Sequence, residues 1–155
     1  MNKVKIELPK SQIARMKALL KKAGRREIGG VLMAEQIENG IFRIVDFSVD
    51  EVSGTQAHFV RSTEHHQAAL QDFFAKTGND YERFNYLGEW HSHPSFPVRP
   101  STEDRFSMQS LVEGERGIPF AALLIVKRSA IWRFECSAML FQQGQSPSHA
   151  TLEIK

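Results

Sequence analysis

Residues 91–104 have the sequence HSHPSFPVRPSTED, and this stretch decides how the chain folds around a site. Two histidines separated by one residue are followed directly by a proline and, after six intervening residues, by S-x-x-D. Side chains two apart on a β-strand project from the same face, so His91 and His93 can converge on one metal ion. Pro94 cannot continue the ladder of hydrogen bonds, which predicts that the strand ends there and opens into a loop.

The second half of the motif supplies a carboxylate. Ser101 is a natural N-cap, so Asp104 falls in the first turn of a helix, where the helix dipole stabilises its charge. Each half alone has a simpler explanation, because His-x-His pairs occur on solvated strands and Ser-x-x-Asp is a common capping box. All five residue types at this spacing should coincide at fewer than about one in a million positions. Two imidazoles and one carboxylate form a zinc-binding set with a fourth position open to water, which is typical of catalytic sites.

The complete motif resembles the signature of the JAMM (JAB1/MPN/Mov34) zinc metallopeptidase family, in which an upstream glutamate precedes H-x-H-P-x6-S-x2-D. Glu27, in EIGGVL over residues 27–32, matches that glutamate and lies 64 positions before His91 (91 − 27 = 64). The resemblance covers about residues 9–137. It implies a JAB1/MPN-type α/β (α+β) domain that is cytidine-deaminase-like, with a central mixed β-sheet flanked by helices.

The resemblance also implies a role for each residue of the site. His91, His93 and Asp104 would bind one catalytic Zn²⁺, which lowers the pKa of a bound water toward neutrality. Glu27 would take the proton of that water during attack on a carbonyl and pass it to the leaving nitrogen. Ser101 would donate a hydrogen bond to the tetrahedral oxyanion in addition to capping its helix.

Two other glutamates are alternatives for the general base. Glu35 follows the apolar run that begins after Glu27. Glu89 lies two residues before His91, so alternation places it on the metal-facing side of the strand. The glycine pair behind Glu27 and the family resemblance favour Glu27.

Several other residues near the motif have ordinary explanations. His65 and His66 lie within an expected helix, where exposed surface positions are expected. His58, on an extended segment, is a weaker candidate for the cleft. Phe96 and Val98 lie in the loop over the site, where they either contact a substrate or pack on the sheet.

Hydrophobic periodicity predicts a domain in which strands are interspersed with three helices. We expect strands near residues 1–8, 27–34, 41–47, 85–90, 120–126 and 131–136, the first of them at an edge, and helices over 9–23, from 62 or 63 to 76, and from 101 onward. The tail after residue 142 is polar, and no element is assigned to it. With no repeat or linker, residues 1–155 are expected to form one domain.

The composition is that of an ordinary globular protein. The 155 residues are 41% hydrophobic and 25% charged, with a net charge of +2 that gives little reason to expect a nucleic-acid partner. The one cysteine, Cys136, excludes an internal disulfide and favours a reducing compartment. No apolar run approaches the roughly 20 residues that a membrane span needs, and the N-terminus lacks a signal-peptide core, so we expect a cytoplasmic protein.

The resemblance also implies a substrate class. Members of the family mostly cleave bonds after the C-terminal glycine of ubiquitin or ubiquitin-like proteins, and YLGEWHSHP over residues 86–94 is similar to bacterial stand-alone forms. Some of these accompany activating-like and conjugating-like enzymes in CBASS-like antiphage operons, which implies a deconjugating isopeptidase with those enzymes as partners. Two alternatives stay open: release of a sulfur-carrier extension or a small-molecule amide by the same site, and a non-catalytic MPN scaffold.

Overall fold

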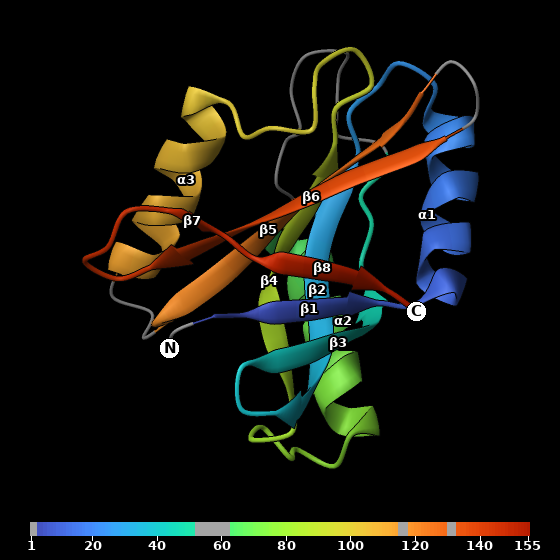
Figure 1. Cartoon of the computed structure of the whole chain (residues 1–155). Coiled ribbons are helices and arrows are strands. Elements are labelled where there is room, and N and C mark those ends of the chain that lie inside the picture. Colours follow the sequence, from blue (N-terminus) through green and yellow to red (C-terminus); the bar gives the residue numbers. More distant parts are fainter. Residues whose placement is uncertain (1–2, 52–62, 115–117, 130–132) are drawn as a thin grey trace.

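The computed structural model describes residues 3–51, 63–114, 118–129 and 133–155, and its described strands form one mixed sheet (Figure 1). The strand order is β7-β6-β5-β4-β2-β3-β1-β8. The strands are β1 (Lys5–Leu8), β2 (Gly29–Glu38), β3 (Ile41–Phe47), β4 (Phe84–Ser92), β5 (Phe120–Arg128), β6 (Phe134–Gln142), β7 (Ser148–His149) and β8 (Thr151–Ile154). The helices are α1 (Lys10–Ala23), α2 (Thr63–Lys76) and α3 (Thr102–Glu113).

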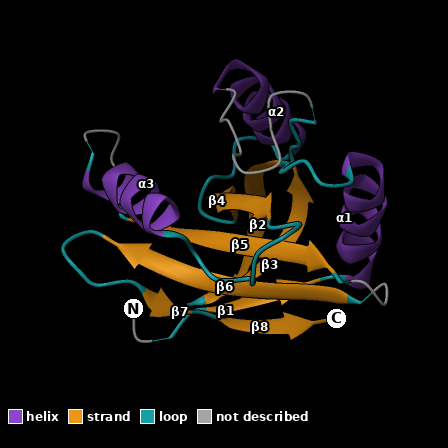
Figure 2. Ribbon diagram, turned by 90° about the horizontal axis from the view of Figure 1, so that it is seen from above, coloured by secondary structure: helices purple, strands orange, loops and turns teal. Residues whose placement is uncertain are grey.

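The three helices cover the two faces of this sheet, as alternation along β5 shows (Figure 2). Leu124 and its even-numbered neighbours belong to the core cluster that contains Met16 of α1. Leu123 and its odd-numbered neighbours pack instead with Met108 of α3. Helix α2 lies on the same face as α3, where Phe73 packs against β2. The expected helix-flanked mixed sheet is therefore confirmed.

The two edges of the sheet meet at Ala150. This residue separates β7 from β8, which stand at opposite ends of the strand order. Its N–H donates to the carbonyl of Ala138 on β6 at 3.1 Å, and the N–H of Thr151 donates to the carbonyl of Val4 at 3.0 Å. The sheet curls until its edges are joined, which protects them from pairing with another chain.

One expectation from the sequence is wrong at these edges. The first strand is not at an edge, because β8 pairs with β1 in parallel and covers it. The tail after residue 142, to which no element is assigned from the sequence, holds β7 and β8. Both strands are short and largely exposed, so they lack the apolar alternation by which a strand is predicted. The other expected elements are confirmed to within about four residues, except that the strand expected over 131–136 is observed as β6 and continues to Gln142. His58 and residues 130–132 lie outside the described part. That residues 1–155 make up one domain stays a prediction.

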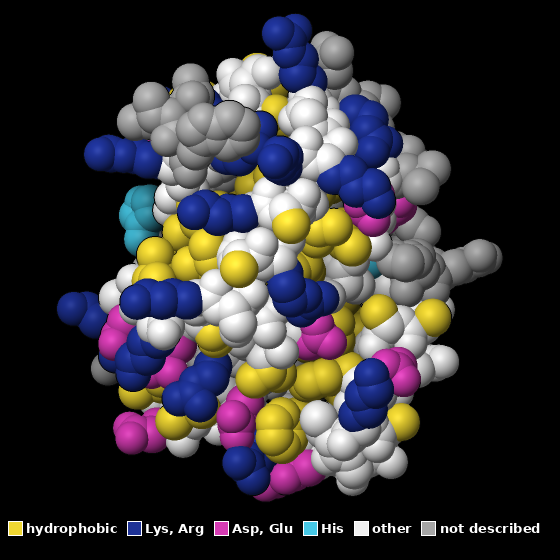
Figure 3. Space-filling model, turned by 90° about the vertical axis from the view of Figure 1, so that its right-hand side faces the viewer, with side chains coloured by type: hydrophobic (Ala, Val, Ile, Leu, Met, Phe, Trp, Pro, Cys, Tyr) yellow, Lys and Arg dark blue, Asp and Glu magenta, His cyan; other side chains and the backbone are white. Residues whose placement is uncertain are grey.

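Helix α1 is amphipathic, as its sequence predicts. Its inner face buries Met16, Leu20 and Ala23. Figure 3 shows Lys and Arg side chains spread over the face of the molecule that carries this helix, and the exposed basic residues of α1 are Lys10, Arg15, Lys17, Lys21 and Lys22. None of the helices among the described residues has the length and apolarity to cross a membrane.

Gly88 lets β4 pass close to β5. Its φ of +155° is rarely adopted by other residues, and a Cβ at this position would lie 1.9 Å from the carbonyl oxygen of Ala122. The register of β4 against β2 shifts just here, between Leu32 and Met33. A glycine is therefore required three residues before the first histidine of the motif.

We predict that Gly88→Ala lowers the free energy of unfolding by about 3 kcal/mol or more, because the added methyl must displace the backbone of β5. Gly78→Ala is the matched control, since Gly78 also has a positive φ (+67°) but open space around its Cβ position. It should lower the stability by only about 1–2 kcal/mol. Urea unfolding measures the stability of both variants. Equal losses of stability would contradict the close approach of β4 to β5 at Gly88.

Candidate metal centre

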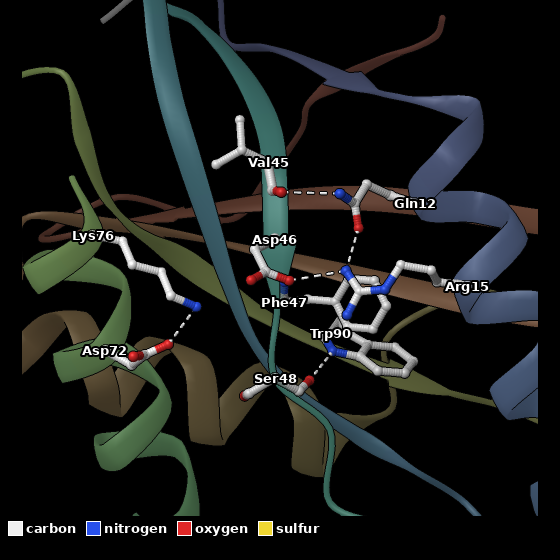
Figure 4. A network of polar contacts seen from close by, with 9 residues as sticks. All are labelled: Gln12, Arg15, Val45, Asp46, Phe47, Ser48, Asp72, Lys76 and Trp90. Atoms are coloured by element: carbon white, nitrogen blue, oxygen red, sulfur yellow. Dashed lines mark hydrogen bonds and ion pairs between the residues drawn. The ribbon is translucent and has the colours of Figure 1, made fainter.

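Trp90 fixes the strand that carries the histidines. Its side chain is fully buried, and its ring meets that of Phe47 edge-on at 5.2 Å. The indole Nε1–H donates to the carbonyl of Ser48 at 2.8 Å, as Figure 4 shows. Because successive side chains of a strand alternate, anchoring Trp90 on the α1 face directs His91 to the opposite face.

Helix α1 holds the end of β3 that receives Trp90 (Figure 4). Gln12 donates to the carbonyl of Val45 at 2.9 Å. The guanidinium of Arg15 lies 2.9 Å from the carboxylate of Asp46 and packs over the ring of Phe47. The β3 residues next to the indole are thus held by both a strand and a helix.

The segment that carries Glu27 is bound to the end of β4. The N–H of Ile28 donates to the hydroxyl of Ser92 at 3.0 Å, and the N–H of Ser92 donates to the carbonyl of Ile28 at 2.8 Å. Gly29 pairs with His91, and a Cβ on Gly29 would lie 2.3 Å from the carbonyl oxygen of Trp90. The absence of a side chain at Gly29 allows this approach and places Glu27, which is 5% exposed, beside the histidines.

Ser101 and Asp104 form the expected capping box at the start of α3. The hydroxyl of Ser101 accepts from the N–H of Asp104 at 3.0 Å, and Oδ2 of Asp104 accepts from the N–H of Ser101 at 2.8 Å. The same Oδ2 lies 3.3 Å from Nε2 of His91 and 3.3 Å from Nε2 of His93. The carboxylate of Asp104 therefore both completes the capping box and faces the two histidines.

Three ligand atoms converge at this point, since the Nε2 atoms of His91 and His93 are 3.1 Å apart. The Nδ1 of His93 is 2.9 Å from the carbonyl oxygen of Pro97. A carbonyl only accepts, so Nδ1 carries the hydrogen, and the Nε2 of the neutral ring keeps its lone pair. The imidazoles of His91 and His93 and the carboxylate of Asp104 could together hold a metal ion.

The charges within this group favour an added cation. Burial raises the pKa of Asp104, but the imidazoles of His91 and His93, which donate to its carboxylate when they are protonated, outweigh it and hold the pKa well below its usual range. Burial lowers the pKa of His93, but hydrogen bonds to Asp104 and to the Pro97 carbonyl outweigh it, and the pKa is raised. The site thus stabilises positive charge between its ligand atoms, and a metal ion can supply that charge in place of a proton.

The converging residues open into a cavity of about 740 Å³. Of the three glutamates considered for the base, Glu27 and Glu89 line this cavity. Glu35 does not, because it lies six residues beyond Gly29 on β2 and its carboxylate is 2.6 Å from the guanidinium of Arg83. The cavity lining therefore excludes Glu35 as the general base and leaves Glu27 and Glu89 as candidates.

The other residues considered in the sequence lie in different surroundings. Phe96 lines the cavity at 47% exposure, with its ring edge-on to His93, whereas Val98 packs against the cluster around Met108. The expected exposure of His66 is wrong. This side chain is buried, and its Nδ1 is 2.7 Å from the hydroxyl of Ser48.

His66 could have been found from spacing, because it precedes Leu70 and Phe73 by four and seven residues on one helical face. The side chain of His65 and the segment with His58 lie outside the described part. Arg99, Ser107 and Met108 also line the cavity. No spacing rule predicts that these residues line the cavity, because their positions depend on how the loop and α3 pack.

A mixed sheet with a convergent His-His-Asp group at the end of β4 defines an α/β domain with a group that could hold a metal ion. Residues 9–139 match the family described as prokaryotic homologues of the JAB domain, and the chain belongs to this family. The family resemblance that the motif indicates is thus confirmed.

The proteins similar to the chain include an isopeptidase and a solved structure. The CD-NTase/cGAS isopeptidase of Vibrio cholerae serotype O1 is 34% identical over 68 residues, which are 44% of this chain and 40% of that protein. The match thus spans less than half of the relative's length. The solution structure of a protein from Desulfitobacterium hafniense superposes with a TM-score of 0.74 at 22% identity, covering 97% of this chain and 92% of that one. This second likeness concerns the fold alone.

We predict that the chain binds one Co²⁺ ion through His91, His93 and Asp104. Loss of a hydrogen-bond partner of a metal ligand weakens metal binding by roughly 10–100-fold. Asp104→Asn changes a proposed ligand itself, so it should weaken binding by more than that. Binding to the wild type should weaken as the pH falls through the raised pKa of His93, because protons and metal compete for Nε2.

Titration followed by visible absorption measures the affinity. Asp72→Asn is the control, since Asp72 pairs with Lys76 on the surface of α2. Equal affinities for the wild type and Asp104→Asn would contradict the proposed ligand set.

Proposed function

We propose that this chain is a zinc-dependent isopeptidase that releases a conjugated, ubiquitin-like protein from a target lysine in a bacterial antiphage system. The convergence of His91, His93 and Asp104 beside Glu27 in one cavity carries the proposal. Family membership and the partial likeness to an isopeptidase of Vibrio cholerae support it. A cytoplasmic location beside activating-like and conjugating-like enzymes completes the proposal.

The spacing of the ligand atoms supports zinc as the metal. A tetrahedral site with bonds of about 2.0–2.1 Å has edges of about 3.3–3.4 Å between its ligand atoms. The three distances here are 3.1, 3.3 and 3.3 Å. Two neutral imidazoles and one carboxylate are also a donor set that zinc accepts in catalytic sites, where a fourth position stays open.

Glu27 is assigned the proton transfers of the reaction. When bound, the zinc ion polarises the scissile carbonyl and activates a water at neutral pH. The Glu27 carboxylate takes a proton from the attacking water as the new C–O bond forms. It then gives this proton to the lysine Nε as the C–N bond breaks. The burial of Glu27 beside His91 and His93 supports this role.

Ser101 is assigned the stabilisation of the carbonyl oxygen. Its hydroxyl accepts the N–H of Asp104 with one lone pair, so its own hydrogen remains able to donate. The residue is exposed and lines the cavity, within reach of an entering substrate. As negative charge develops on the carbonyl oxygen, this hydrogen bond strengthens.

We predict that Glu27→Gln keeps its zinc but loses about 10²–10⁴-fold in kcat, because an amide cannot accept the proton. The substrate for this test is a peptide whose C-terminal glycine is joined to the Nε of a lysine, with a metal chelator as a second condition. Glu35→Gln is the matched control, removing the same charge from β2 outside the cavity. If Glu27→Gln turned over at the rate of Glu35→Gln, the assignment of the base would be wrong.

A further inference from the structure

Glu89 lies in the same cavity but has no part in the proposed chemistry. It is two residues before His91 on β4, so both side chains are on the face opposite Trp90. Its side chain is 6% exposed and lines the cavity. Two residues of a strand span about 7 Å, so this carboxylate lies one to two substrate residues from the metal ligands.

The cavity is rich in negative charge beyond what the metal requires. Asp104 and Glu27 are used by the metal and the proton transfers. Glu89 and Glu103 also line the cavity. Among the described lining residues, the permanent cation is Arg99, which is exposed at the rim. A positively charged group that enters is attracted toward the buried end.

The wall beside Glu89 is apolar. Met108 of α3 and Leu123 of β5 line the cavity, and each is almost fully buried. Leu123 is the direct neighbour of Glu89 across the β4–β5 pairing. Lysine and arginine pack their aliphatic stems along such surfaces while the charged head seeks a polar partner. A carboxylate in a low-dielectric site binds that head more strongly than an exposed one does.

We propose that Glu89 is a specificity-determining residue, which binds a Lys or Arg side chain of the substrate next to the scissile bond. This inference rests on the proposed function and adds the chemistry of the substrate that the site selects. The cationic head contacts the Glu89 carboxylate, and the stem lies on Met108 and Leu123. The bond-breaking chemistry stays with the residues around the metal.

The test measures kcat/KM on a series of isopeptide-linked peptides. Lysine, neutral norleucine or glutamate is placed before the terminal glycine, and then on either side of the modified lysine. At one of these positions the wild type should prefer lysine over norleucine by about tenfold, as expected of one charge-assisted hydrogen bond. Glu89→Gln should lose that preference, because its kcat/KM for the lysine peptide falls to that for the norleucine peptide, mainly through KM, while its zinc content stays unchanged.

Glu82→Gln is the matched control, since Glu82 is exposed in the turn before β4, at the end opposite the histidines. It should keep the full preference for lysine. Cleavage by the wild type without any preference, or a preference that persists in Glu89→Gln, overturns this inference alone. A zinc-loaded wild type that cleaves none of the peptides overturns the proposed function and this inference with it.

Discussion

The close pairing of the start of β2 with the end of β4 is the constraint on which the rest of the site depends. Reciprocal hydrogen bonds between Ile28 and Ser92 lock the two segments together, and the bare Cα of Gly29 allows the contact with His91. Glu27 and His91 are 64 positions apart in the sequence, so only this pairing brings a candidate base beside a candidate ligand. On the other face of β4, Trp90 keeps the strand from rotating.

The third candidate ligand, Asp104, depends on a different kind of constraint. Asp104 is held by its own helix, because its carboxylate accepts the N–H of Ser101 while its N–H is capped in return. A side chain fixed in this way has little rotamer entropy left to lose when it binds a metal. The helix dipole and the two imidazoles favour its charged form, which is the form that binds a cation. The capping box and the ligand role therefore reinforce each other.

The sequence predicted the site better than it predicted the edges of the fold. His91, His93, Ser101 and Asp104 are close in the chain, so strand alternation and capping rules place them, and the family pattern adds Glu27. Short exposed strands such as β8 gain their stability from pairing with β1, which no local pattern reveals. The cavity contacts of Arg99 and Ser107 also come from tertiary packing, whereas helical spacing could have indicated the burial of His66.

Anomalous X-ray diffraction at the zinc absorption edge, on crystals of the zinc-loaded protein, tests the proposed ligand set directly. We expect one strong peak, bonded to Nε2 of His91, Nε2 of His93 and a carboxylate oxygen of Asp104. A solvent atom should complete the coordination within hydrogen-bond reach of Glu27. Zinc bound elsewhere, or bound without Asp104, would show that the proposed metal centre is wrong.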